Sequence, residues 1–312
     1  MDYRLERTLP FGDLINAIAF SPDGAHLAVA TRDKAANNHI FQLRDWSPRR
    51  APRSQRRTLA FDGAGALYAA GVSVERFDLA SPRPDKATLK IPGHKRGITD
   101  VVVSPDGRWV AVHKYLETLE VWYVGGGDPT QLGSFSAISI KQYFFRADSA
   151  VFCFTDSRYR AGRSVDTLHQ LPLLDGAVSP LVDGPLPEGL STYDPVFSSP
   201  LGLAAITFGE HDLTLYDWDS LTPRRLGVEA VQRSVMRASL ALSPDGAFAL
   251  IEPVTDPRRP WGLLVVSLAT GEVTARVNLG DTSAGLMALA PGGARVAFVP
   301  SDGTREVRVF AP

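Results

Sequence analysis

Short apolar runs separated by turn residues recur along the whole chain. In the stretch INAIAFSPDGAHLAVA, two such runs flank the turn Ser21–Gly24. The same Ser-Pro-Asp-Gly turn returns at Ser104–Gly107 and Ser243–Gly246, again between apolar runs. Runs of about five residues that are rich in Val, Ile, Leu, Phe and Ala and show little polar alternation predict strands that are buried on both faces.

The turns are regularly spaced. Equivalent turn positions are Gly24, Gly65, Gly107, Ser149, Gly202, Gly246 and Gly293. The intervals between them are 41, 42, 42, 53, 44 and 47 residues. In the Ser-Pro-Asp-Gly copies, proline presets φ at the first corner and glycine takes the left-handed position that closes a tight hairpin. A period near 42 residues indicates a repeat architecture.

Each repeat contains more than the two strands around its turn. A third strand follows about ten residues later, as in the segments IFQLRD, VERFDL, LEVWYV, LTLYDW, LLVVSL and VRVFAP. A weaker fourth is visible in TLKI, TQLGSF and EVTARVNL. Four antiparallel strands in 40–45 residues are typical of a β-propeller blade. We therefore predict an all-β, seven-bladed β-propeller that forms a single domain over residues 1–312.

The two ends of the chain complement each other. The last repeat offers three strands, GLMALA, RVAFV and EVRVFA, before the chain stops at Pro312. At the other end, the strand-like segment Tyr3–Leu9 precedes the first full repeat and belongs to none. We predict that this segment is the outer strand of the last blade, which closes the ring.

The repeats resemble those of WD40-repeat β-propellers over essentially the whole chain. Degenerate forms of the Trp-Asp dipeptide end several third strands, at Phe77-Asp78, Trp122-Tyr123, Tyr216-Asp217 and Phe310-Ala311. The Gly-His pair of the family occurs once, at Gly93-His94. The resemblance implies a buried network of His94 and Trp122 with a strand-two Ser or Thr, but the segment RWVAV has neither, so the network is at most partial. Similar turns also occur in propellers that resemble TolB or lactonases.

Function is expected on the face of the propeller opposite the Ser-Pro-Asp-Gly turns. There, connections between the second and third strands and between blades vary most, and binding sites concentrate in such loops. The expanded segments are Thr155–Asp166, Asp183–Pro195 and Glu252–Gly262, and shorter ones are Gly93–Gly97 and His113–Glu117. We expect all five to be loops.

Basic and aromatic residues gather in these segments. The candidate binding residues are His94, Lys95, Arg96, Lys114, Tyr115, Arg158, Tyr159, Arg160, Arg163, Arg258, Arg259 and Trp261. Arg, Tyr and Trp dominate interface hot spots because they combine a large contact area with directional bonds. The alternative is that long loops simply need solvated residues. As a set, the residues predict a protein or peptide partner with acidic character.

Charge and composition argue against other partners. The net charge is −1, so no global field marks a nucleic-acid or membrane binder. Six arginines lie between Arg44 and Arg57 against the single acid Asp45. This stretch could contact phosphates or an acidic partner, but a charged outer edge that blocks aggregation is favoured. No apolar run is long enough to span a bilayer. We expect a cytoplasmic protein that binds neither membranes nor nucleic acid.

Sequence motifs for catalysis are absent. The chain has no G-x-S-x-G elbow, H-E-x-x-H pair or P-loop. Its 6 histidines are scattered, and its 1 cysteine, Cys153, builds neither a disulfide nor a zinc site. We predict a non-catalytic scaffold or recognition module without cofactor or metal. The alternative is a lactonase-like propeller enzyme with a metal at the central channel, because oxygen ligands from separate blades leave no spacing to detect.

Overall fold

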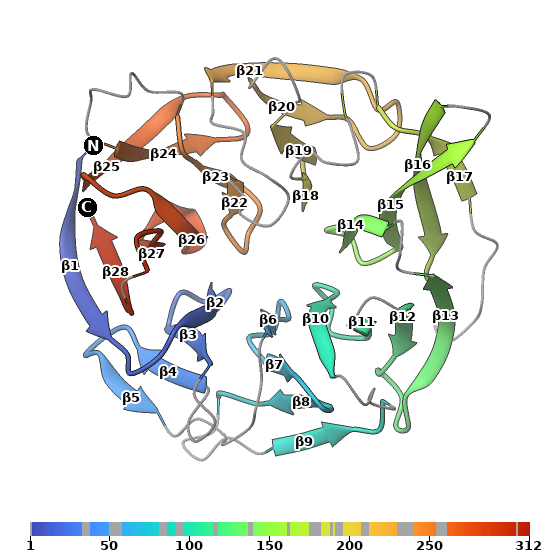
Figure 1. The fold of residues 1–312 in the computed structure, drawn as a ribbon, viewed down its shortest axis with the longest axis horizontal. Helices are drawn as coiled ribbons and strands as arrows, with labels where there is room; N and C mark the ends of the chain where they lie inside the picture. The colour runs from blue at the N-terminus through green and yellow to red at the C-terminus, as the bar shows by residue number, and fades with distance from the viewer. Residues whose placement is uncertain are drawn as a thin grey trace. The chain divides into compact units, whose positions relative to one another are not determined.

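The computed structural model describes most of the chain as β-strands (Figure 1). The described residues are 2–32, 38–49, 58–80, 86–91, 97–114, 118–136, 140–160, 163–174, 182–187, 190, 196–206, 212–229, 240–253, 261–303 and 305–312. They contain one 3₁₀ turn, η1 (Pro291–Gly293), and no helix that is long and apolar enough to cross a membrane.

The chain divides into two compact units. Unit 1 comprises Met1–Phe11, Phe154–His169 and Asp183–Pro312, and unit 2 comprises Gly12–Cys153 and Gln170–Val182. Apart from the N-terminal strand, neighbouring strands in their sheets follow one another in the chain.

Unit 2 contains three complete four-stranded sheets, β2–β5, β6–β9 and β10–β13. Their strands are β2 (Ile15–Phe20), β3 (His26–Thr31), β4 (Asn38–Gln42), β5 (Ser47–Arg49), β6 (Thr58–Phe61), β7 (Leu67–Ala70), β8 (Val74–Phe77), β9 (Lys86–Leu89), β10 (Ile98–Val103), β11 (Trp109–Lys114), β12 (Thr118–Tyr123) and β13 (Thr130–Ser136). All pairs in these sheets are antiparallel.

Unit 1 contains the four-stranded sheet β18–β21 and an eight-stranded sheet in the order β22-β23-β24-β25-β1-β28-β27-β26. The strands are β1 (Asp2–Pro10), β18 (Val196–Ser199), β19 (Gly202–Ile206), β20 (Asp212–Tyr216), β21 (Pro223–Glu229), β22 (Leu240–Leu242), β23 (Phe248–Ile251), β24 (Trp261–Ser267), β25 (Val273–Gly280), β26 (Ala284–Leu289), β27 (Val296–Pro300) and β28 (Glu306–Ala311). The eight-stranded sheet is antiparallel except where β1 meets β25.

A further four-stranded sheet is formed by β14 (Ile140–Phe145), β15 (Val151–Arg160), β16 (Arg163–Pro172) and β17 (Val182–Pro185). The boundary between the two units runs through its strands. The predicted all-β propeller fold, with four-stranded antiparallel blades, is confirmed.

Burial follows the position of a strand within its sheet. Every residue of β3, β7, β19 and β27 is buried. The outer strand β25 instead alternates between exposed and buried positions. Second strands have neighbours on both faces, which explains why their sequences lack polar alternation. Outer strands present one face to solvent and keep the period of two.

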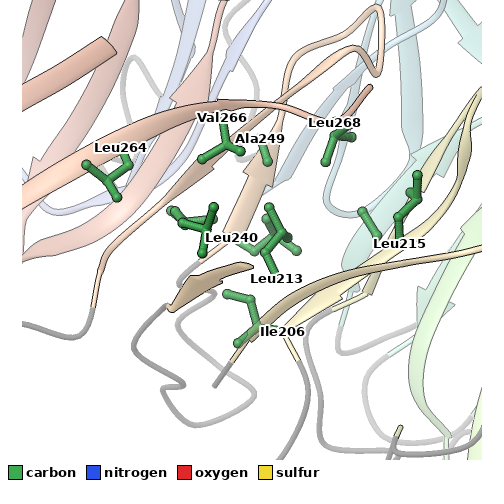
Figure 2. Packing of buried hydrophobic residues seen from close by; sticks show 11 residues of the cluster. Ile206, Leu213, Leu215, Leu240, Ala249, Leu264, Val266 and Leu268 are labelled. Carbon is green, nitrogen blue, oxygen red and sulfur yellow. The ribbon is translucent and has the colours of Figure 1, made fainter. Parts of the chain in front are cut away.

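The blades pack face to face through apolar clusters. Figure 2 shows one such cluster in unit 1, in which Ile206, Leu213 and Leu215 of the β18–β21 sheet meet Leu240 and Val266 of the next sheet. All five are buried, and Ile206, Leu213 and Val266 have no exposed area. Burying one such side chain contributes roughly 1.5–3 kcal/mol relative to leaving it exposed, so the neighbouring sheets stabilise each other.

The predicted turns are present at all seven positions. Their φ angles are positive: Gly24 67°, Gly65 87°, Gly107 71°, Ser149 59°, Gly202 146°, Gly246 64° and Gly293 69°. In the Ser-Pro-Asp-Gly copies, the serine hydroxyl donates to the aspartate carboxylate and accepts the N–H of the first residue of the second strand. For Ser104 these bonds measure 2.5 Å to Asp106 and 3.0 Å from Trp109.

Six of the seven turns are also bonded to a neighbouring turn. In unit 2, the Gly63 N–H donates to Pro105 O at 2.7 Å, and the Asp106 N–H donates to Ser149 Oγ at 3.0 Å. In unit 1, Ser199 Oγ donates to Gly246 O at 2.6 Å, and the Gly292 N–H donates to an Asp245 carboxylate oxygen at 2.7 Å. The repeated turn is therefore both a hairpin corner and a connector between blades.

The N-terminal strand completes the last sheet, as the sequence predicts for Tyr3–Leu9. Strand β1 pairs antiparallel with β28, from Arg4↔Ala311 to Pro10↔Glu306. Glu6 receives two bonds from the guanidinium of Arg295, at 2.7 and 3.2 Å. Backbone pairing and this bidentate ion pair together hold the N-terminal strand in unit 1.

Candidate functional site

Strands β15 and β16 form an arm that is longer than the corresponding strands elsewhere. Each has 10 residues, whereas the second and third strands of the other sheets have between 4 and 7. We call residues 155–160 and 163–168 the β15–β16 arm. The expectation that Thr155–Asp166 is a loop is wrong, because only residues 161 and 162 lie outside strands and outside the described residues. The segment from Val151 to Arg160 contains no glycine, proline or asparagine to end a strand.

Polar residues at the base of the arm are buried. Thr155 is 2% exposed, Asp156 1% and His169 6%. The imidazole of His169 stacks on the ring of Phe154, with centroids 4.6 Å apart and planes at 17°. Buried polar groups require partners, and in the arm these come from three strands of the same sheet.

Asp156 is the centre of this network. One carboxylate oxygen accepts a bond from Arg158 Nε at 2.6 Å, and the other lies 3.3 Å from His169 Nε2. On the far side of the ring, His169 Nδ1 is 2.6 Å from a carboxylate oxygen of Asp183 in β17. The network thus links β15, β16 and β17 at the base of the arm.

The Arg158 side chain is held by a hydrogen bond and is still half-exposed. Its side chain is 53% exposed, although its partner Asp156 is 2% exposed. A guanidinium has five N–H donors in a rigid plane, so a bond through Nε orients the plane without using the other donors. An oriented, half-exposed guanidinium is suited to bidentate binding of a carboxylate.

The arm collects four of the residues that the sequence singles out. Arg158, Tyr159 and Arg160 lie in β15 and Arg163 lies in β16, although only the Arg158 side chain is described. An apolar residue, Val165, is 44% exposed on the same arm.

Lys114 lies elsewhere than expected. It was predicted in an exposed loop, His113–Glu117, but His113 and Lys114 belong to β11 and Lys114 is 8% exposed. Its ammonium nitrogen is 2.7 Å from Glu120 Oε2, and the same oxygen accepts the Trp122 indole N–H at 3.0 Å. Because its charge is satisfied inside the sheet, Lys114 is corrected from a surface anchor to a structural residue.

The same cluster contains Trp122, which the resemblance to WD40 repeats places in a buried hydrogen-bonded network. Trp122 has a partner, but the partner is Glu120 on its own strand, paired in turn with Lys114 of the second strand. Trp122 is thus hydrogen-bonded without a strand-two Ser or Thr. His94, the other member of the implied network, lies outside the described residues.

A second polar cluster joins the first strands of three successive sheets in unit 2. Asp100 of β10 accepts bonds from Thr58 Oγ1 of β6 at 2.7 Å and from Tyr143 Oη of β14 at 2.6 Å. The His113 ring nitrogen Nδ1 lies 3.5 Å from the same tyrosine oxygen. Burial raises the pKa of Tyr143 well above its usual value and lowers the pKa of His113. These residues are far apart in sequence, so no local spacing reveals the cluster.

The other candidates cannot be placed. His94, Lys95, Arg96, Tyr115, Arg258 and Arg259 lie outside the described residues. Trp261 opens β24, but its side chain is not described. Of the three remaining expected loops, Glu252–Gly262 begins with a buried residue, Glu252, and Asp183–Pro195 begins inside β17, whereas only Gly97 of Gly93–Gly97 is among the described residues. The arginine-rich stretch Arg44–Arg57 is described only as far as residue 49 and includes β5.

The described residues offer little for metal binding or cysteine chemistry: they hold no metal-ligand cluster and one cysteine, Cys153. No group of three or more His, Cys, Asp or Glu residues there has an arrangement that could hold a metal ion. Cys153 is 1% exposed, as its apolar surroundings predict, and burial raises the pKa of its thiol to about 12. At neutral pH this thiol is protonated and unreactive.

Comparison with protein families detects the repeats. The family model described as WD40, WD domain, G-beta repeat, matches residues 4–37 and 85–112. Each match begins at an outer strand, β1 or β9, and continues into the first two strands of the following sheet. The repeat recognised in the sequence is therefore offset by one strand from the sheet. This offset agrees with the position of β1 as the outer neighbour of β28.

Solved structures share the fold. The crystal structure of the Cps50 (Swd1) β-propeller domain from Myceliophteria thermophila matches with a TM-score of 0.65 and 12% sequence identity, over 99% of each chain. In total 1439 chains of solved structures match, and a fold this widespread does not single out a partner. No curated protein matches the sequence. The family model and the structural match confirm the predicted resemblance to WD40-repeat β-propellers.

Proposed function

We propose that this protein is a non-catalytic interaction module whose β15–β16 arm binds an acidic segment of a protein or peptide partner. The observation that carries this proposal is the half-exposed side chain of Arg158, whose guanidinium is held by a carboxylate that is itself almost completely buried. Its orientation is set before any partner arrives, so little side-chain entropy is lost on binding.

The composition of the arm supports an acidic partner. Three arginines, Arg158, Arg160 and Arg163, lie on its two strands, and Val165 adds exposed apolar surface. Arginine beside apolar area is the combination that interface hot spots favour. WD40-like propellers typically serve as interaction scaffolds, which agrees with recognition rather than bond chemistry.

The test uses the full chain and an array of immobilised peptides that differ in Asp and Glu content. We expect binding to rise with acidic content and to weaken with salt. Arg158→Ala should reduce binding, and Val165→Ser should do so to a smaller extent. Arg108→Ala is the matched control, because Arg108 also binds an aspartate two residues earlier through Nε, at 2.7 Å, but belongs to a turn.

Affinity purification followed by mass spectrometry extends the same comparison to natural partners. A partner that is captured equally by the original chain, by Arg158→Ala and by Val165→Ser does not bind the arm. That result for every captured partner would overturn the proposal. Unfolding temperatures of the variants must be recorded in parallel, because loss of Arg158 also leaves Asp156 with fewer partners.

The ring as a whole is part of the same proposal. The eight-stranded sheet divides into two antiparallel sets, β22–β25 and β26–β28 with β1, and the strand pairing that joins the two sets is a short parallel one. Counting each set as a blade gives a single seven-bladed domain closed by its N-terminal strand. Deleting residues 1–9 should then lower the unfolding temperature sharply, because the deletion exposes β28 and removes the Glu6–Arg295 ion pair. A truncated chain that melts like the full chain would contradict this closure.

A further inference from the structure

The outer strands of the described sheets differ in how they are protected. An edge strand presents a row of unpaired backbone groups, and proteins commonly guard such edges with charges or proline. Five of the outer strands carry charged residues or proline. These residues are Pro48 and Arg49 in β5, Lys86 in β9, Asp183 and Pro185 in β17, Pro223, Arg224, Arg225 and Glu229 in β21, and Arg276 in β25. Strand β13, TQLGSFS, has no charged residue and no proline.

Strand β13 is also long and accessible. It has 7 residues, and Thr130, Gln131, Ser134 and Ser136 are exposed. On one side it pairs with β12 from Thr118↔Ser136 to Tyr123↔Thr130. On its other side, no strand among the described residues pairs with it. A neutral edge of this length is a template for adding another strand.

The molecule already contains one edge that takes a further strand. At the outer edge of β25, Asp2 and Tyr3 of β1 pair in parallel with Arg276 and Val277. There the charge of Arg276 lies opposite that of Asp2, so the added strand is complementary to the edge. For a neutral edge such as β13, the complementary strand is another neutral one.

We propose that β13 pairs antiparallel with β13 of a second copy of this chain, which makes a two-fold symmetric dimer with a sheet continuous across the interface. A two-fold axis brings identical elements together. Pairing β13 with any other described outer strand would place a charge or a proline against the neutral edge. Self-pairing instead sets Thr, Gln and Ser opposite one another, and hydroxyl pairs across strands are favourable.

Sedimentation velocity of the full chain over a range of concentrations tests the proposal. We expect a monomer–dimer equilibrium that is nearly independent of salt, because no ion pair forms at the edge. The double variant Gln131→Lys/Ser134→Lys adds like charges at two exposed positions of the strand and should weaken the dimer at least about tenfold. The matched control, Thr8→Lys/Val273→Lys, adds the same charge at exposed positions of β1 and β25 and should leave the dimer unchanged.

Each outcome is decisive. A dimer that dissociates in the β13 variant but not in the control, with unchanged unfolding temperatures, supports the inference. A dimer that persists in the β13 variant lies at another surface, and a chain that is monomeric at every concentration does not pair through β13. Either of these two results overturns the proposal.

Discussion

The Ser104–Gly107 turn and the β15–β16 arm contain the same local contact in different surroundings. In the turn, Arg108 Nε binds an oxygen of Asp106 at 2.7 Å, and in the arm Arg158 Nε binds an oxygen of Asp156 at 2.6 Å. The carboxylate of the turn is 27% exposed, whereas that of the arm is 2% exposed. A single sequence spacing therefore gives a solvated turn contact in one place and a buried anchor in the other.

The two regions also differ in repetition. The turn recurs in successive sheets, and six of its seven copies are bonded to a neighbouring turn, as in the contacts of Pro105, Asp106 and Gly246. The arm occurs once among the described sheets, and its network stays within one sheet. The repeated turns join neighbouring blades, whereas the arm departs from the repeat, which is one reason why we propose it as the place where a specific partner binds.

The largest effect is expected for Gly202→Ala in the turn of the β18–β21 sheet. Gly202 has φ +146°, a region that only glycine occupies readily. A Cβ there would overlap the Tyr216 carbonyl oxygen. We expect a loss of more than about 3 kcal/mol in the free energy of unfolding, measured by denaturant titration.

Gly65→Ala is the matched control for that substitution. Gly65 holds the equivalent turn position with φ +87°, but a Cβ there meets nothing within 4 Å. Only the left-handed backbone penalty of about 1–2 kcal/mol applies. Equal losses in the two variants would show that the overlap of a Cβ with the Tyr216 carbonyl oxygen costs nothing beyond the left-handed backbone penalty.

A smaller loss of unfolding free energy is expected when the arginine of either aspartate–arginine contact is removed, and the two losses should differ. Arg158→Ala removes a bond from a buried carboxylate and should cost about 1–3 kcal/mol of unfolding free energy. Asp156 keeps His169 nearby, at 3.3 Å, which limits the loss. Arg108→Ala removes a bond from a more exposed carboxylate and should cost less than about 1 kcal/mol. Thermal unfolding of both variants compares them directly, and the reverse order would refute the distinction drawn between anchor and turn.

Much of the turn region could be predicted from the sequence, and little of the arm. The turn depends on local rules, so the spacing located even Ser149, which adopts φ 59° without being glycine. The arm depends on partners that are distant in sequence. In the sequence, the polar residues around Asp156 resemble a solvated loop. The structure shows instead that Phe154 stacks on the ring of His169 and that the Asp183 carboxylate lies at His169 Nδ1. The overlooked signal in the sequence was that the segment from Val151 to Arg160 contains no glycine, proline or asparagine.

Lys114 is a second residue whose surroundings depend on a partner that the sequence does not reveal. Its position beside Tyr115 predicts a binding residue, but its burial depends on Glu120, six residues later and across a strand pair. A lysine in a short hydrophilic stretch is usually exposed. Only the register of β11 against β12 places its ammonium group beside a carboxylate inside the sheet.

A small effect is also expected for Ser104→Ala, and it should depend on pH. Burial alone would raise the pKa of Asp106, but hydrogen bonds from Ser104 and Arg108 outweigh burial and lower it. A carboxyl with a lowered pKa stabilises the fold above about pH 4, and this contribution is lost as the pH falls through the folded-state pKa. Ser104→Ala should therefore cost about 1 kcal/mol at neutral pH and less in acid.

The deficit should narrow in acid without vanishing, because Ser104 also accepts the Trp109 N–H, which does not titrate. Ser47→Ala provides the contrast, since Ser47 makes the same hydroxyl bond to an aspartate, Asp45, at 2.6 Å in a solvent-exposed turn. Its loss should be smaller at every pH, because water replaces the hydroxyl there. Thermal unfolding from neutral pH to below pH ~4 measures both variants. If the Ser104→Ala deficit stays constant over that range, the bond between hydroxyl and carboxylate does not stabilise the turn.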